Sequence, residues 1–170
     1  MSPPVPQTPF ELAESFNRLP RLENSPSGKV NNEWIFSVRK VDIEPPGLVL
    51  HMTNTPSRYT HVEKLPVDHT AFSSPSKLGL PIALCLMKSF VEGLGTSHSL
   101  PNERIRPYAP WKWGVGPQDS VLAKEVEKWL KSLKVREELS KVQVFGEDDK
   151  KVEDQVWEDF FKTLKSAITL

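Results

Sequence analysis

The 170-residue chain has a single cysteine, no excess charge of either sign and no long hydrophobic run. One cysteine excludes an internal disulfide, a CxxC redox pair and a zinc site built from cysteines. The 22 basic residues balance the 22 acidic ones, so no bulk field draws the protein towards nucleic acid or an anionic membrane. Zero net charge also leaves self-association as a homo-oligomer open. The longest apolar run covers residues 82–87, far below the ~20 residues of a membrane-spanning helix.

The chain also lacks the usual targeting and catalytic signatures. Its first twenty residues have neither the basic region nor the apolar core of a secretory signal, so we expect a soluble protein of the cytoplasm or nucleus. No GxxxxGK[ST], GxGxxG, HExxH, GxSxG or EF-hand pattern is present. These absences weaken the case for an enzyme, and we expect no cofactor and no metal.

Proline is present but unevenly placed, since all 16 prolines lie at or before Pro117. Proline breaks helix interiors, which predicts strands, turns and short helices in the first part and mostly helix in the last third. Periodic apolar residues predict helices near 9–19, 81–94, 119–135 and 148–168. Thr8, Pro9 and Glu11 form a typical helix start, with a capping hydroxyl, a proline at the first position and a glutamate that completes a capping box.

Alternation of apolar and polar side chains predicts the strands. Trp34, Phe36 and Val38 alternate with polar residues, and the same pattern follows the Pro-Pro-Gly turn at 48–52, which indicates a hairpin. A weaker strand is predicted at 58–65, and a short one at 141–145. The fold class is therefore α+β, with a small antiparallel meander of three to four strands packed against about four helices. We expect one domain over 8–170 and a disordered tip at 1–7.

The most unusual segment lies within 96–118, a long connection interrupted by prolines. Here aromatic and basic side chains interleave, and the candidate binding residues are Arg104, Arg106, Tyr108, Trp111, Lys112 and Trp113. Aromatic platforms flanked by cations can grip a partner peptide, hold a ligand or stack bases. The segment carries little net charge, which disfavours nucleic acid. The same aromatic residues would also suit packing of the connection onto the core, and both interpretations stay open.

Two histidines suggest an alternative. If the turn before the third strand uses residues 54–58, His51 lies directly opposite His61 and both imidazoles share one face of the sheet. With Glu63, Asp68 or His69 nearby, they could serve a metal-assisted or acid–base hydrolase. A shift of one residue in strand register would separate them. Cys85, by contrast, has Leu84 and Leu86 as neighbours, so we expect a buried structural thiol rather than a nucleophile.

The sequence thus favours a non-catalytic protein that binds a partner protein or a small ligand through residues 104–113. The hydrolase with a His51/His61 pair is the alternative, and a structural subunit of an assembly is a third hypothesis.

Overall fold

A computed structural model describes residues 7–24, 30–42, 46–93 and 107–168 of the chain. Its centre is one mixed sheet in the order β3-β2-β1-β4-β5. The strands are β1 (Glu33–Val41), β2 (Gly47–Asn54), β3 (Tyr59–Lys64), β4 (Lys112–Val115) and β5 (Gln143–Val144). The expected α+β class is confirmed, although the sheet has five strands and is not purely antiparallel.

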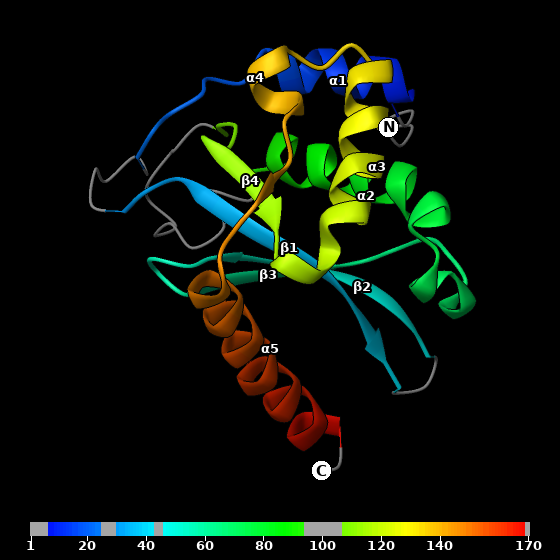
Figure 1. The fold of residues 1–170 in the computed structure, drawn as a ribbon, viewed down its shortest axis with the longest axis vertical. Helices are drawn as coiled ribbons and strands as arrows, with labels where there is room; N and C mark the ends of the chain where they lie inside the picture. Colours follow the sequence, from blue (N-terminus) through cyan, green and yellow to red (C-terminus); the bar gives the residue numbers. More distant parts are fainter. Residues whose placement is uncertain (1–6, 25–29, 43–45, 94–106, 169–170) are drawn as a thin grey trace, which may run out of the picture.

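Helices cover both faces of this sheet (Figure 1). The α-helices are α1 (Pro9–Asn17), α2 (Pro75–Val91), α3 (Ser120–Ser132), α4 (Glu137–Ser140) and α5 (Glu147–Ile168), with short 3-10 turns η1 (His69–Ser73) and η3 (Pro117–Asp119). In Figure 1, α1, α2 and α3 lie on one side of the sheet, and α5 lies on the other. No helix in the described ranges is both long enough and apolar enough to cross a membrane.

The start of α1 follows the predicted chemistry. The Thr8 hydroxyl accepts a hydrogen bond from the Glu11 amide, and the Glu11 carboxylate accepts one from the Thr8 amide. These two bonds satisfy donors that a helix end would otherwise leave unpaired. Ala13 and Phe16 then bury the inner side of the helix against the core.

The start of α2 differs from the prediction. A helix was predicted near 81–94, but α2 begins at Pro75 and holds Pro81 in its interior. An internal proline costs one backbone hydrogen bond, and the helix is maintained by packing on both sides of it. Gly79 lies so close to α3 that an added Cβ would stand 2.9 Å from Trp129 Cδ1. Contact with α3 therefore stabilises helical residues of α2 that precede the predicted start near residue 81.

The predicted meander of β1, β2 and β3 is present, but the expected register of β3 is wrong by one residue. His51 pairs with Val62, and His61 pairs with Met52. The turn between β2 and β3 places Arg58 at a φ of 62°, so β3 begins at Tyr59, opposite Asn54. Because side chains alternate along a strand, this shift places the two histidines on opposite faces of the sheet.

Two strands join the meander in parallel, β4 on β1 and β5 on β4. The strand predicted near 141–145 corresponds to β5, whereas β4 lies inside the connection expected to be irregular. Gly114 permits this pairing, since an added Cβ would collide with the Gln143 backbone. Residues 94–106 of that connection, and residues 1–6 of the predicted disordered tip, lie outside the described ranges.

The two faces of the sheet have different chemistry. The face towards α1 and α2 is apolar, with Trp34, Phe36, Leu48, Leu50, Met52 and Trp113 buried in one core with both helices. The face towards α5 carries polar residues in its middle, including the buried Ser37, His51 and Thr53. Two regions can therefore form a site, the edge of the apolar core and the polar patch under α5.

Candidate functional site

The structure describes four of the six residues predicted to bind a partner or ligand. Tyr108 and Trp113 are buried, at 4% and 1% exposed, and Trp113 stacks on Phe16 with ring centroids 5.3 Å apart. These two rings contribute to the core and are not available to a ligand in this conformation. Arg104 and Arg106 lie outside the described residues.

Trp111 and Lys112 remain at the surface. The guanidinium of Arg21 lies 3.9 Å from the centroid of the Trp111 ring and also donates to the Trp111 carbonyl at 2.8 Å. The Lys112 side chain is about half exposed, and its ammonium lies 3.9 Å from the Glu33 carboxylate. Of the four described residues, Tyr108 and Trp113 therefore belong to the core, and Trp111 and Lys112 form a small pair at the surface.

A buried polar network lies under α5. Glu153 is fully buried and is bound by three groups: Arg39 forms an ion pair with Oε2, His51 Nδ1 lies 3.0 Å from the same oxygen, and Lys150 Nζ lies 3.1 Å from Oε1. We call Glu153 with Arg39, His51 and Lys150 the Glu153 network. Arg39 also contacts Asp154 at 2.7 Å. The network connects α5 to β1 and β2.

The electrostatics of the network keep Glu153 ionised. Burial by itself would raise the pKa of Glu153, but the hydrogen bond with His51 and the charges of Arg39 and Lys150 outweigh it and lower the pKa to about 2. An ionised carboxylate only accepts hydrogen bonds, so Nδ1 of His51 carries a proton. Burial raises the pKa of the nearby Asp119 carboxyl, with Lys150 opposing that shift.

His51 therefore has different partners from those expected. Its Nε2 lies 2.5 Å from the Thr60 hydroxyl and 3.3 Å from the Thr53 hydroxyl, while His61 contacts Glu63 at 2.8 Å on the other face. The order hydroxyl, imidazole, carboxylate resembles a nucleophile with its base. However, the His51 and Glu153 side chains are fully buried, and Arg39 and Lys150 hold the carboxylate. We therefore interpret the network as structural.

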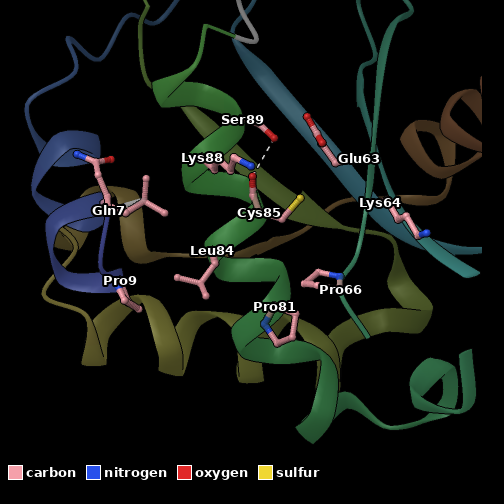
Figure 2. Close-up of a pocket in the computed structure, with 11 residues that line it drawn as sticks. Gln7, Pro9, Glu63, Lys64, Pro66, Pro81, Leu84, Cys85, Lys88 and Ser89 are labelled. Atoms are coloured by element: carbon pink, nitrogen blue, oxygen red, sulfur yellow. Dashed lines mark hydrogen bonds between the residues drawn. The ribbon is translucent and has the colours of Figure 1, made fainter. Parts of the chain in front are cut away.

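A cavity of about 430 Å³ opens between α1, α2 and the end of β3 (Figure 2). We call it the helix–strand cavity. Its walls are largely apolar and include Pro9, Leu12, Pro66, Pro81 and Leu84. Its charged lining residues are Glu63 and Lys64 on β3 and Lys88 on α2, and Figure 2 shows the ammonium of Lys64 turned away from the cavity. Concave apolar sites of this size with a few polar groups are typical of small-ligand sites.

Cys85 lies in the wall of this cavity, next to Leu84. Burial raises the pKa of its thiol to about 12, and the charge of Glu63 acts in the same direction. Ser89 donates to the Cys85 carbonyl at 2.8 Å, and its hydroxyl lowers the thiol pKa without outweighing burial. A thiol with this pKa is almost entirely protonated at neutral pH, so Cys85 is not an activated nucleophile here.

Within the described ranges, no three side chains of histidine, cysteine, aspartate or glutamate converge on a point that could hold a metal. Comparison with known proteins adds no further constraint. No family model, curated protein or solved structure matches this chain.

Sequence reasoning missed the helix–strand cavity because its residues are far apart in the chain. Its prolines and Leu84 carry local signals, but these signals are those of turns and helices and do not indicate a cavity. The cavity forms where α1 and α2 meet the end of β3. The Glu153 network was missed for the same reason, since Arg39, His51 and Glu153 belong to three separate elements.

Proposed function

We propose that the protein is a non-catalytic binding protein whose ligand is a small, mostly apolar molecule carrying one carboxylate. The observation that supports this proposal is the helix–strand cavity, whose volume of about 430 Å³ lies within the range typical of small-ligand sites. Its apolar walls would be the main source of affinity, because burial of apolar surface contributes roughly 25 cal/mol per Å².

The charges around the cavity favour an anionic end group. Lys64 and Lys88 line the cavity with Glu63, and the Glu63 carboxylate already lies 2.8 Å from His61 Nε2. The Lys64 ammonium is turned away from the cavity in Figure 2, and His61 engages the Glu63 carboxylate, so the Lys88 ammonium is the charge left for a ligand carboxylate. Lys88 belongs to the last turn of α2 and lines the cavity beside Cys85 and Ser89.

The first experiment compares three ligands with the same chain, decanoate, decan-1-ol and decylamine, by isothermal titration calorimetry. We expect decanoate to bind most tightly and decylamine at least about tenfold more weakly, because the Lys88 ammonium attracts the carboxylate and repels the ammonium group. Absence of binding by all three ligands would refute the proposal.

Variants locate the site. Leu84→Trp fills the cavity and should abolish decanoate binding, whereas Val121→Trp, at a position 62% exposed on α3, adds the same ring elsewhere and should leave binding unchanged. Lys88→Met should reduce the preference for decanoate over decan-1-ol. Unchanged binding by Leu84→Trp, in a variant that retains its far-ultraviolet circular dichroism, would contradict the assignment.

A partner protein at the 104–113 segment is the second candidate, and the surface pair of Trp111 and Lys112 supports it. Alanine replacements at Arg104, Arg106 and Lys112 test it in pull-downs from lysate with the tagged full chain. Loss of a reproducibly captured partner would support the proposal, and retention of every partner would refute it. The proposal includes a location in the cytoplasm or nucleus, which cell fractionation tests.

A further inference from the structure

β3 is a terminal strand of the sheet, so one of its backbone edges has no neighbouring strand within the described part of the chain. The hydrogen bonds to β2 show which residues face that edge. The Leu65 amide donates to the Leu48 carbonyl at 2.9 Å, so Leu65 and every second residue before it direct their backbone groups towards β2. In an antiparallel pair, successive residues direct their N–H and C=O groups alternately to either side. Thr60, Val62 and Lys64 therefore present theirs to the open edge.

Open edges of this kind are templates for a further strand, and proteins usually protect them with proline, bulges or inward charges. β3 contains no proline between Tyr59 and Lys64, and its pairing with β2 is regular over all six residues. Its exposed cation, Lys64, lies at the end of the strand. The edge therefore has neither proline nor a bulge, and the charge in its middle, Glu63, is already paired with His61.

We propose that a second copy of this chain pairs with β3 in antiparallel orientation about a two-fold axis at Val62. In this register Val62 lies opposite Val62 of the second copy, and Thr60 lies opposite Lys64. All three residues have outward N–H and C=O groups, so the two strands can form about six backbone hydrogen bonds. The two five-stranded sheets become one continuous sheet.

Side-chain charge selects this register. With Val62 on the axis, His61 of each copy lies opposite Glu63 of the other, in non-hydrogen-bonded pairs where side chains approach most closely. Within one copy His61 Nε2 already lies 2.8 Å from Glu63 Oε1, on the same face. The four side chains then form two cross-strand pairs, so that each imidazole has one carboxylate on its own strand and another on the second copy.

The neighbouring registers lack this complementarity. Moving the two-fold axis from Val62 to Glu63 places Glu63 opposite Glu63 and brings Pro66, which has no N–H, opposite Thr60. Moving the axis to His61 instead places His61 opposite His61 and Lys64 opposite Arg58. Like charges directly opposite each other destabilise a sheet, so both alternatives are disfavoured. Zero net charge removes the general repulsion that would oppose association of two copies.

The first experiment measures the dissociation constant of the full-length dimer by sedimentation velocity, from about 1 to 500 μM, a range that covers weak and moderate dimers. Val62→Pro removes an outward N–H while leaving the bonds to β2 intact, and it should give a monomer. His61→Glu places like charges opposite each other twice and should weaken the dimer at least about tenfold. The swap His61→Glu with Glu63→His restores complementarity and should return the constant to within about threefold of the parent value.

The second experiment tests the register by disulfide cross-linking in a Cys85→Ser background. Val62→Cys places two thiols about 5.5 Å apart by Cα distance, within disulfide range, and should give a covalent dimer on mild oxidation. His61→Cys is the matched control, since its two copies lie diagonally and too far apart to link. A monomer at all concentrations, a dimer insensitive to both Val62→Pro and His61→Glu, or cross-linking at 61 but not at 62 would overturn the proposal.

Discussion

Replacement of Glu153 by glutamine tests how strongly the Glu153 network holds α5 on the sheet. The substitution keeps the shape of the side chain and removes the charge that compensates Arg39 and Lys150, whose side chains are only 20% and 13% exposed. Removal of one partner from a buried ion pair destabilises a protein by about 3–5 kcal/mol. Asp154 still pairs with both cations, at 2.7 Å from Arg39 and 3.2 Å from Lys150. We expect a loss at the lower end of that range.

The pKa of Glu153 leads to the same magnitude. It falls from an ordinary 4.5 to about 2 on folding, which corresponds to about 3 kcal/mol of stability at neutral pH. Because the folded-state pKa is depressed, this stability is fully present above the unfolded-state pKa and is lost as the pH falls towards 2. Roughly 40% of it is lost by pH 3.5, one unit below the unfolded-state value.

The assay is urea unfolding of the parent protein and of Glu153→Gln, followed by tryptophan fluorescence at pH 7 and at lower pH. The difference in unfolding free energy should be about 3 kcal/mol at pH 7 and should shrink with acidification, since glutamine does not titrate. Glu158→Gln, an exposed site on the same helix, makes the same charge change and should stay within about 0.5 kcal/mol of the parent. A difference below about 1 kcal/mol at pH 7, or one that does not vary with pH, would refute the reasoning.

Three further predictions follow from local geometry. Gly79→Ala should lower the free energy of unfolding by about 1–3 kcal/mol despite the better helix propensity of alanine, because the added Cβ would stand 2.9 Å from Trp129. Urea titrations measure this loss, and Lys77→Ala, at an exposed position of the same helix, is the control. Iodoacetamide should alkylate Cys85 at pH 8 about a thousandfold more slowly in the folded protein than in urea, because burial raises the thiol pKa from 9.0 to about 12. Mass spectrometry measures both rates, and equal rates would contradict the prediction. Thr8→Ala should cost about 1 kcal/mol through loss of the α1 cap, measured by thermal unfolding, with no change expected for the exposed Ser76→Ala.

Much of the fold could be predicted from local patterns. The capping box of α1, the hairpin of β1 and β2 and the long apolar stripe of α5 all depend on residues within a few positions of one another. The expected limits of α5, 148–168, differ by one residue from the observed Glu147–Ile168. Local spacing is sufficient for such elements because the interactions that form them are themselves local.

Predictions that required contacts between distant residues fared worse. β4 was missed because Lys112–Val115 has little alternation of its own and forms by parallel pairing with β1. The His51/His61 pairing was wrong because the conformation at Arg58 shifts β3 by one residue. For the candidate binding residues, the pattern of rings and cations left core packing and ligand contact open, and the structure places Tyr108 and Trp113 in the core.

The sequence by itself determined the α+β class, the absence of disulfides and the order of most helices and strands, because composition and short-range periodicity carry that information. Only the tertiary structure decided which side chains meet. It placed Glu153 against Arg39 and His51, opened a cavity between α2 and β3, and left one edge of β3 without a neighbouring strand in the described ranges. The physical reason is that register and helix packing are set by interactions between residues far apart in the chain, which no local pattern encodes.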